Sequence, residues 1–222
     1  MTAQNTREWL RSLPVFETPA PDFDPVQVPE QPVELFLGWL RDAADAGVPA
    51  AHAVTVATST PDGPTSRVVI LKDVDADGWQ FATNQTSPKG RALAADPRTA
   101  LTFFWPSRGR QVRVLGVAEA LPAAESAEDF LARPVASRAA SIVGKQSEAL
   151  SGPAEYREAA DAARELVQAE PGALAAGWTV YRVRPTVVEF WQASRDRAHV
   201  RVEYRRDAGG VTGAWTHGML WP

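Results

Sequence analysis

The chain has 222 residues, of which 45% are hydrophobic and 23% are charged, and its formal net charge at pH 7 is −4. This length suits one domain with a sizeable core, and the composition is that of an ordinary globular protein. The slightly negative charge gives no general attraction to nucleic acid or to an anionic membrane, so neither is expected as a partner. The absence of Cys excludes disulfides, thiolate metal sites and a Cys nucleophile.

The N-terminal segment is polar and has no apolar run typical of a signal peptide. No stretch approaches the ~20 apolar residues that span a bilayer, and we expect a cytoplasmic protein. Prolines recur through residues 14–32, which disfavours a helix and predicts an extended segment. We therefore take residues 1–32 as a Pro-rich N-terminal arm and residues 33–222 as a single domain.

From Val33, apolar residues recur at helical spacing and Gly47 supplies a C-terminal stop, which predicts a helix between them. Short β-type runs separated by turn residues follow this helix. We predict strands at 53–59, 66–74, 79–83, 100–105 and 111–121, a hairpin loop at 106–110 and a short helix at 87–96. Short strands with few long helices favour an antiparallel sheet or barrel over a parallel α/β fold.

The middle of the chain has the pattern of helices. Ser126 and Asp129 match a capping box with Ser126 as the N-cap. This helix is expected to end near Arg133, because Pro134 disfavours helical geometry at the residue before it. A surface helix rich in Ala and Glu is predicted at 154–169. Further strands are predicted at 178–184, 186–193 and 198–206, so the fold class is α+β, mainly β with flanking helices.

Several common catalytic motifs are missing from the sequence. It has no Walker loop and no G-x-G-x-x-G motif, and its three His lie too far apart to have the spacing of a metal site. No nucleophile-elbow motif supports a hydrolase. We therefore expect no metal, and the candidate chemistry rests on cations and amides at strand ends and turns.

Two cations flank one apolar run. Arg67 precedes the residues 68–71, Val-Val-Ile-Leu, and Lys72 follows them. Such a pair can hold a phosphate or a polarisable ring, or it can simply flank an apolar strand as gatekeepers. Positions 67 and 72 point to opposite faces of a regular strand. They can serve one ligand only if the strand bends or the ligand wraps around its end.

Two further segments carry positive charge. The predicted helix start at 87–90 contains Lys89, and helix starts favour anions, although most of them bind only water. Arg197, His199 and Arg201 alternate, so a strand would place them on one face as an electropositive surface or as ordinary solvent-facing residues. That surface should keep His199 neutral unless an acid lies nearby. Trp191 either forms one side of a binding site for a flat ring or is an aromatic residue of the core.

Taken together, these segments resemble the pyridoxine/pyridoxamine 5′-phosphate oxidase family. The resemblance runs from about residue 33 to the C-terminus, and its specificity comes from the fixed order of five segments. These are SRVVILK, FATNQTSPKGRAL, ALTFFWPSRGRQVRVLG, DFLARPVASRAASIVGKQS and VEFWQASRDRAHVRVEY. The resemblance implies a homodimer of FMN-binding split β-barrels, with the cofactor in clefts between the subunits.

The resemblance also implies roles for individual residues. The expected FMN-binding residues are Arg67, Val68, Val69, Ile70, Leu71, Lys72, Thr83, Lys89, Gln111, Gln146, Ser147, Trp191 and Arg201. The expected substrate-binding residues are Lys72, Arg133, Ser137, Arg197 and His199, and Arg197 with His199 are the expected catalytic pair. The implied reaction oxidises pyridoxine or pyridoxamine 5′-phosphate to pyridoxal 5′-phosphate, with hydride-type transfer from the substrate C4′ to the flavin N5 and reoxidation by O₂ to H₂O₂.

The sequence departs from the family pattern at several positions. Asp129 replaces a Tyr that belongs to the substrate-phosphate site, and a carboxylate facing that site would repel a phosphate. The capping box would instead turn Asp129 back to its own helix. Pro88 replaces a basic residue, Ala82 replaces an aromatic one, and the C-terminal segment 218–222 is altered. The alternatives are a flavin oxidase of the same fold with another substrate, as in phenazine biosynthesis, and a non-catalytic FMN- or haem-binding module.

Overall fold

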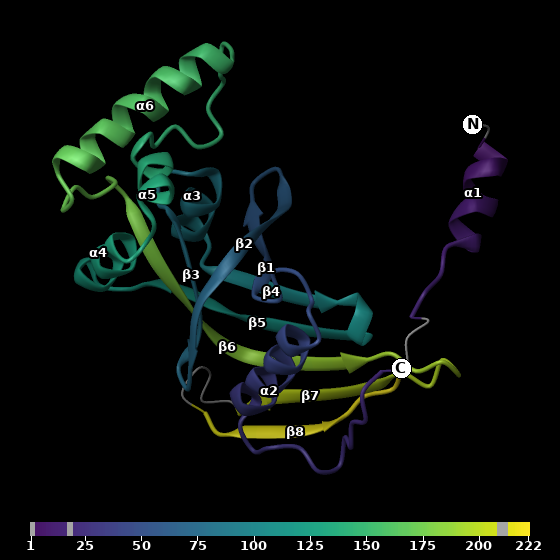
Figure 1. Cartoon of the computed structure of the whole chain (residues 1–222). Coiled ribbons are helices and arrows are strands. Elements are labelled where there is room, and N and C mark those ends of the chain that lie inside the picture. Colours follow the sequence, from purple (N-terminus) through teal and green to yellow (C-terminus); the bar gives the residue numbers. More distant parts are fainter. Residues whose placement is uncertain (1–2, 17–19, 208–212) are drawn as a thin grey trace.

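One antiparallel sheet organises the parts of the chain that the computed structural model describes, residues 3–16, 20–207 and 213–222. The strand order is β3-β2-β1-β4-β5-β6-β7-β8, and an additional pairing of β3 with β6 closes the first six strands into a barrel (Figure 1). The strands are β1 Ala53–Thr60, β2 Gly63–Asp75, β3 Gly78–Asn84, β4 Arg98–Trp105, β5 Arg110–Ala120, β6 Trp178–Gln192, β7 Val200–Arg206 and β8 Trp215–Met219. The predicted α+β class and split barrel are confirmed.

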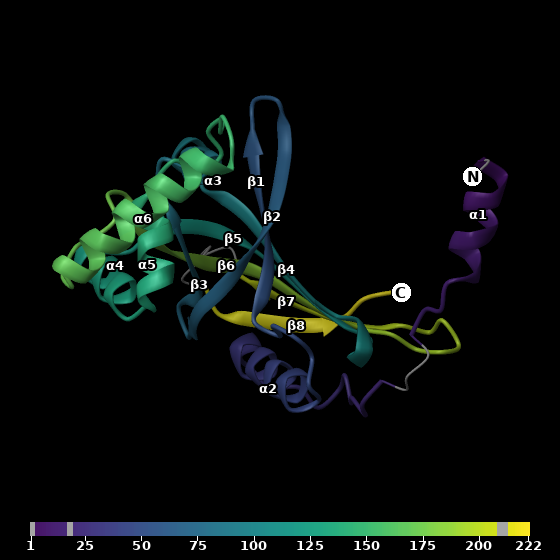
Figure 2. The same cartoon turned by 45° about the horizontal axis from the view of Figure 1, so that its top comes forward.

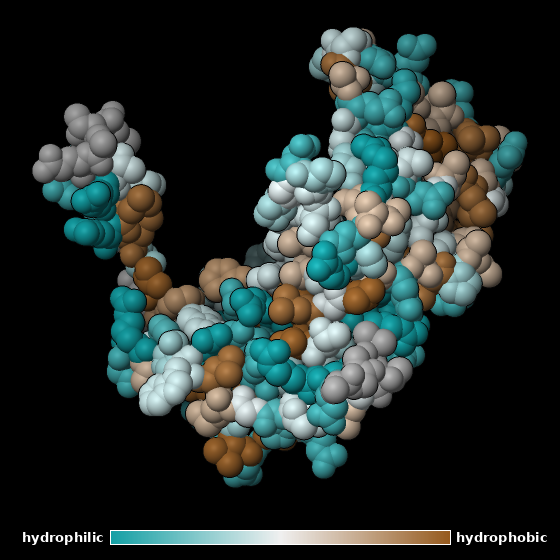
Figure 3. Space-filling view, turned by 180° about the vertical axis from the view of Figure 1, so that it is seen from behind, coloured by the Kyte–Doolittle hydropathy of each residue, from teal (hydrophilic) through white to brown (hydrophobic). Residues whose placement is uncertain are grey.

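The helices lie in three places around this barrel. They are α1 Ala3–Ser12, α2 Pro32–Asp45, α3 Pro88–Ala95, α4 Ala123–Leu131, α5 Val135–Ile142, α6 Pro153–Ala169 and the short 3₁₀ helix η1 Pro106–Arg108. Helix α2 lies beneath the strands (Figure 2). Helices α4 to α6 gather at one end of the barrel, beside α3, and form the helical lobe (Figure 2). Helix α1 stands away from the body, so the molecule seen from behind is hollowed between α1 and the helical lobe (Figure 3). In the described residues no helix is both long and apolar enough to span a membrane.

The long strand β6 connects the barrel to the outer strands. Its first part pairs with β3, and its last part pairs with β7 on the same edge. The sequence predicts two strands here, one on each side of Pro185, but the strand is continuous. Pro185 lies opposite Gly116 at a register shift in β5, where a Cβ on Gly116 would come 2.2 Å from the Arg184 carbonyl oxygen. A bulge that needs glycine therefore absorbs the proline.

Helix α2 and the barrel strands bury their apolar side chains in one core. Phe36, Trp39 and Ala43 follow each other at helical spacing and are all buried. Phe36 packs edge-on against Trp79, with ring centroids 5.4 Å apart. The helix begins with Pro32 at its first position and is followed by Gly47 at φ +75°, as proline and glycine preferences at helix ends favour. The predicted helix is confirmed, one residue longer at its start.

The predicted arm is partly extended and partly helical. Its residues 1–2 and 17–19 lie outside the described residues. The segment 20–31 has no helix or strand and is held to the sheet by two hydrogen bonds, from Gln192 Nε2 to the Pro21 carbonyl (2.9 Å) and from the Tyr204 hydroxyl to the Pro29 carbonyl (2.8 Å). Helix α1 was not predicted.

The capping-box prediction is wrong. Helix α4 begins four residues earlier than expected, with Pro122 rather than Ser126 at the N-cap, so Ser126 lies inside the helix. The Ser126 hydroxyl accepts a hydrogen bond from the Val180 backbone N–H (3.0 Å), which joins α4 to β6. A tertiary contact thus uses the side chain that the local motif assigned to capping. Strand β8 was also missed, and β7 begins at Val200 rather than at residue 198.

Candidate functional site

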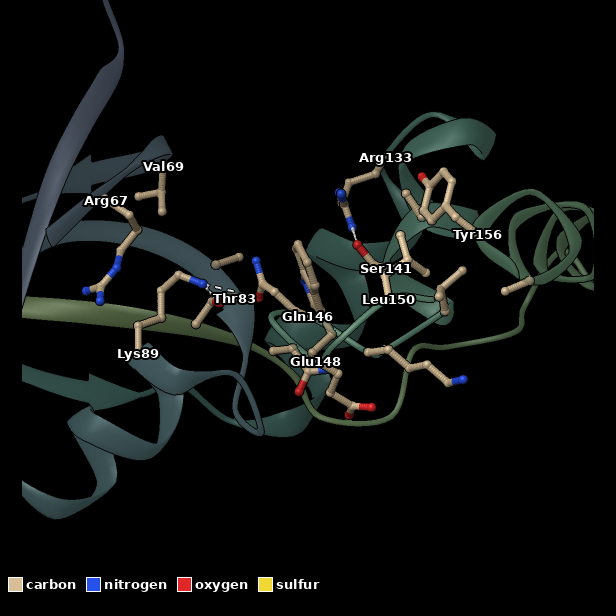
Figure 4. A pocket seen from close by; sticks show the side chains of 18 of the residues that line it. Arg67, Val69, Thr83, Lys89, Arg133, Ser141, Gln146, Glu148, Leu150 and Tyr156 are labelled. Atoms are coloured by element: carbon tan, nitrogen blue, oxygen red, sulfur yellow. Dashed lines mark hydrogen bonds between the residues drawn. The ribbon is translucent and has the colours of Figure 1, made fainter. Parts of the chain in front are cut away.

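A cavity of about 620 Å³ lies between the barrel and the helical lobe. Figure 4 shows Arg67, Val69, Thr83 and Lys89 on the barrel side, and Arg133, Ser141, Leu150 and Tyr156 on the helical side, with Gln146 between them. The residues named on the barrel side come from β2, β3 and α3, whereas Arg133 follows α4 and Ser141 lies on α5. Segments far apart in the sequence therefore share one cavity.

Two cations at the barrel end of the cavity have no anionic partner. Lys89 is only 6% exposed, and its Nζ donates to Thr83 Oγ1 (2.9 Å) and Gln146 Oε1 (3.2 Å). The Arg67 guanidinium donates to Thr58 Oγ1 (2.9 Å) and Thr65 Oγ1 (2.8 Å). Within the described ranges, neither cation forms an ion pair. Burial, and then the positive charge of Arg67, lower the pKa of Lys89. A bound anion would compensate both charges.

The local sequence explains why Lys89 points into the barrel end. Ser87 caps α3 by accepting a hydrogen bond from the Gly90 backbone N–H (3.2 Å). Gly90 packs against Gln85, whose carbonyl oxygen would lie 2.4 Å from a Cβ at position 90. This tight turn returns the chain toward Thr83, so the lysine reaches back to β3. The predicted helix start with a cation is confirmed, and its lysine contacts the cavity.

A bulge at Lys72 interrupts the regular alternation of side chains in β2, although Lys72 itself does not line the cavity. The register between β2 and β3 shifts between Leu71 and Asp73, which is the bend that a shared ligand requires. Arg67, Val68 and Val69 line the cavity, whereas the side chain of Leu71 is buried in the barrel core. Any contact of Leu71 with a ligand in the cavity would therefore use its backbone. Ile70 is 45% exposed on the outer surface.

Asp129 does not turn back to its own helix, contrary to the capping-box interpretation. Its Oδ1 lies 3.0 Å from Lys72 Nζ, and its Oδ2 accepts a hydrogen bond from Trp178 Nε1 (2.9 Å). The Arg133 guanidinium lies 4.0 Å from the centroid of the Trp178 ring, and its Nη1 donates to Ser141 Oγ (2.8 Å). Burial lowers the pKa of Arg133, and the charge of Asp129 opposes this shift. These residues form one cluster at the helical end of the cavity, where Arg133, Ser141 and Trp178 line it and Lys72 and Asp129 do not.

The remaining residues predicted on this side lie nearby in the chain. Ser137 is half-buried on α5, one helical turn before Ser141. Ser147 follows Gln146 in the loop between α5 and α6 and has a left-handed backbone, φ +71°. Non-glycine residues seldom adopt this conformation, and it is often found at functional sites.

The other predicted site residues lie at a different place on the sheet. Gln111, Trp191 and Arg201 occupy neighbouring positions on β5, β6 and β7. The centroid of the Trp191 ring lies 4.9 Å from that of His199 and 5.4 Å from that of the arm residue Phe16. None of these residues lines the cavity described above. Within one chain, the predicted site therefore forms two clusters.

The prediction that Arg197, His199 and Arg201 share a strand face is wrong. Only Arg201 lies on β7, and Arg197 sits in the preceding turn with φ +69°. The Ser194 backbone N–H donates to His199 Nδ1 (3.0 Å), so this nitrogen carries no proton in the observed arrangement. Arg197 and His199 nevertheless line one small pocket of about 500 Å³ together with Phe16. A turn thus gathers the two residues that alternation assigned to a strand.

Arg201 is held by a buried carboxylate that sequence reasoning did not single out. Glu189 is 4% exposed and accepts from Arg201 Nε (3.1 Å) and from Arg113 (2.9 Å). The hydrogen bond that Arg201 donates to Glu189 raises the pKa of Arg201. Trp178 and Ser141 were missed as well. The partners of Glu189 and Trp178 come from other elements, and Ser141 carries no local motif, so no pattern in the sequence marks them.

Two family models together match all eight strands of the sheet. The model described as pyridoxamine 5′-phosphate oxidase matches residues 40–192, and the one described as the pyridoxine 5′-phosphate oxidase C-terminal dimerisation region matches residues 178–222. The chain is 44% identical over 194 residues to the pyridoxine/pyridoxamine 5′-phosphate oxidase of Thermosynechococcus vestitus, covering 87% of this chain and 90% of that protein. It is 44% identical over 188 residues to the protein of the same name from Nocardioides sp., covering 84% and 88%.

Solved structures agree with these matches. The crystal structure of PhzG from Burkholderia lata in complex with tetrahydrophenazine-1-carboxylic acid superimposes with a TM-score of 0.82 at 31% identity, covering 91% of this chain and 99% of that one. An FMN-binding protein of Nostoc punctiforme shares the fold, with a TM-score of 0.70 at 15% identity, covering 88% and 100%. Fold and sequence therefore define a split-barrel oxidoreductase. The chain belongs to the pyridoxine/pyridoxamine 5′-phosphate oxidase family, an FMN-dependent enzyme family.

Proposed function

We propose that the protein is an FMN-dependent oxidase that converts pyridoxine 5′-phosphate or pyridoxamine 5′-phosphate to pyridoxal 5′-phosphate, with O₂ as the electron acceptor and H₂O₂ as the second product. The observation that carries the proposal is the uncompensated pair of cations, Arg67 and Lys89, in a cavity of about 620 Å³. Family membership supplies the reaction class.

The residues at the barrel end fit the phosphate of FMN. Lys89 is buried among neutral oxygen atoms, and its pKa is lowered by burial and by Arg67, so a nearby anion stabilises both charges. Thr83 and Gln146 already orient the lysine and are positioned beside the same ligand. When bound, the flavin supplies the redox chemistry by accepting a hydride equivalent from the substrate. The protein itself then has to bind and orient the flavin and the substrate, and to exclude water from them.

We propose that the two clusters come together between the subunits of a homodimer. The matched C-terminal dimerisation region, residues 178–222, contains Trp191, Arg197, His199 and Arg201. The outer faces of β2, β4 and β5 carry exposed apolar side chains, which are typical of a protein interface. These are Val68, Ile70, Phe104, Leu115 and Val117. In this arrangement the cavity of one subunit receives Trp191 and Arg201 of the other beside the flavin.

The substrate would lie between the same two clusters. Lys72, Arg133 and Ser137 are proposed to bind the substrate phosphate. Of these, Arg133 lines the cavity, Lys72 pairs with Asp129, and Ser137 lies one helical turn before the lining residue Ser141. Arg197 and His199 of the second subunit are proposed to hold the pyridine ring against the flavin. His199 Nδ1 is occupied by a backbone N–H donor, which leaves Nε2 free to donate to a ring substituent. No strong base is required of the protein.

A second candidate is an oxidase of the same fold with a different substrate. The observation that favours it is Asp129, a carboxylate that contacts Lys72 at the proposed phosphate end. The likeness to PhzG, at 31% identity over most of both chains, supports this candidate too. The fold and the FMN-binding residues would be the same in both cases.

One experiment separates these possibilities. The purified protein is examined for a flavin spectrum, and O₂ consumption is measured with pyridoxine 5′-phosphate and with pyridoxamine 5′-phosphate. We expect a yellow protein that consumes O₂ with at least one of them. A yellow protein that oxidises neither contradicts the proposed substrates and leaves the flavin site standing. A colourless protein that does not take up added FMN contradicts the whole proposal.

A further inference from the structure

Asp129 occupies an unusual place for a carboxylate in a site that takes anions. It lies between Lys72 Nζ (3.0 Å from Oδ1) and Trp178 Nε1 (2.9 Å from Oδ2). The side chains of Lys72 and Asp129 are only 25% and 20% exposed, so solvent screens their interaction weakly. Trp178 lines the cavity directly. The carboxylate is therefore fixed against the cavity wall by two donors from different elements.

The ion pair changes the charge available to a ligand at this end. Two cations, Lys72 and Arg133, lie near the Trp178 ring, with Lys72 Nζ at 5.9 Å and the Arg133 guanidinium at 4.0 Å from its centroid. Asp129 neutralises one of them, which leaves a single net positive charge in the cluster. A doubly negative group would have to compete with Asp129 for Lys72 and would meet its like charge. A singly negative group is matched by Arg133 alone.

We propose, on the basis of the function proposed above, that Asp129 is a specificity-determining residue. It reduces the preference of the site for a doubly negative phosphate and favours ligands with a single negative charge at that end. Trp178 is a positioning residue in this scheme, because its N–H holds the carboxylate toward Lys72. The structure thus assigns to α4 a role in reading the charge of the substrate.

The test is an anaerobic titration of the FMN-loaded protein, followed by flavin absorbance. Pyridoxine 5′-phosphate and unphosphorylated pyridoxine are added separately to the wild-type protein and to Asp129→Asn. A shift of the flavin spectrum reports binding, and bleaching reports reduction. We expect Asp129→Asn to bind pyridoxine 5′-phosphate about tenfold more tightly, the scale of one pKa unit of like-charge interaction. Pyridoxine affinity should change by less than about twofold, because it has no charge at this end.

Glu128→Gln is the matched control. It removes one negative charge from the neighbouring, exposed position of α4, so it should leave both affinities unchanged. A second variant, Lys72→Met, should weaken phosphate binding more in the Asp129→Asn background than in the wild-type protein, because the substitution of Asp129 releases Lys72. Asparagine keeps an acceptor for the Trp178 N–H, which preserves the local fold.

The possible outcomes separate the two proposals. Spectral shifts without bleaching would contradict the proposed oxidase function, while the affinities would still decide the role of Asp129. Unchanged or weaker binding of pyridoxine 5′-phosphate by Asp129→Asn would overturn that role. So would an equal gain with Glu128→Gln, which would indicate a general charge effect. Failure of every variant to bind either compound would show that this cluster is not the substrate end.

Discussion

The two clusters of candidate site residues differ in how their charges are balanced. At the barrel end of the cavity, Arg67 and Lys89 contact neutral oxygen atoms only, among the residues described. In the second cluster, on strands β5 to β7, Arg201 is bound by the buried carboxylate of Glu189. An uncompensated buried cation is costly until a ligand supplies the opposite charge. A compensated one is already held in place. The first cluster is therefore suited to bind an anion, and the second to present side chains in fixed positions.

The largest effect is expected from Lys89→Met. This substitution removes a buried cation that the FMN phosphate would contact, and we expect FMN affinity to fall about 100-fold. The folded-state pKa of Lys89 lies below its ordinary value, so protonated Lys89 destabilises the folded protein at neutral pH. The cofactor-free variant should therefore unfold at a higher temperature than the cofactor-free wild-type protein. Flavin titration and thermal unfolding measure the two effects.

Arg91→Met is the control for this prediction. Arg91 is an exposed cation on the same helix, two residues further on, so its loss should affect neither FMN affinity nor unfolding temperature appreciably. If Lys89→Met bound FMN like the wild-type protein, the phosphate would have to lie elsewhere.

A smaller effect is expected from Arg197→Ala, which tests the second cluster. Arg197 belongs to the small pocket beside His199 and not to the cavity that contains Lys89. We expect kcat/KM to fall about 10- to 100-fold, the scale of a lost hydrogen bond from a charged group, while FMN stays bound. Arg205→Ala is a suitable control, because Arg205 is an exposed residue of β7 that pairs with Glu203. Loss of FMN in Arg197→Ala would place this residue on the cofactor side instead.

Combining the two variants tests whether the clusters meet across subunits. A heterodimer of one Lys89→Met chain and one Arg197→Ala chain, isolated with two different tags, should have one intact site of two. Its activity should therefore be about half that of the wild-type dimer. If both clusters served a site within one chain, each site of the heterodimer would carry a defect, and no activity would be recovered.

The smallest effect concerns the contact between the N-terminal arm and strand β7. Burial, and then the charge of Glu34, raise the pKa of Tyr204 to about 12, and its hydroxyl donates to the Pro29 carbonyl (2.8 Å). The folded state therefore holds this proton more tightly than the unfolded state, whose tyrosine titrates near 10. The contribution of Tyr204 to stability is complete below pH of about 10 and is lost as the pH rises toward 12.

Tyr204→Phe should lower the free energy of unfolding by about 1 kcal/mol at neutral pH, the value of one hydrogen bond. The variant should also lose less stability than the wild-type protein between pH 10 and 12. Urea unfolding at several pH values measures both. Tyr156→Phe serves for comparison, because Tyr156 is half exposed on α6. An equal alkaline loss in wild-type and Tyr204→Phe would contradict the role assigned to this hydroxyl.

Much of the fold follows from short-range patterns in the sequence. The apolar spacing after Val33 predicts α2, alternating residues predict most of the strands, and the Ser87 start of α3 places Lys89 beside the cavity. These features depend on side-chain periodicity and on capping within a few residues, which act in the same way wherever the segment lies. The family resemblance rests on the same segments and is confirmed by the matches.

Tertiary structure decided where the remaining polar side chains are used. Ser126 and Asp129 have the spacing of a capping box, yet Ser126 contacts β6 and Asp129 contacts Lys72 and Trp178. Arg197 and His199 alternate like strand residues, yet a turn holds them. In each case the competing partner lies in another element and offers a hydrogen bond or opposite charge in a weakly solvated place. Such partners outweigh local preferences of about 1 kcal/mol, and only the folded arrangement brings them together.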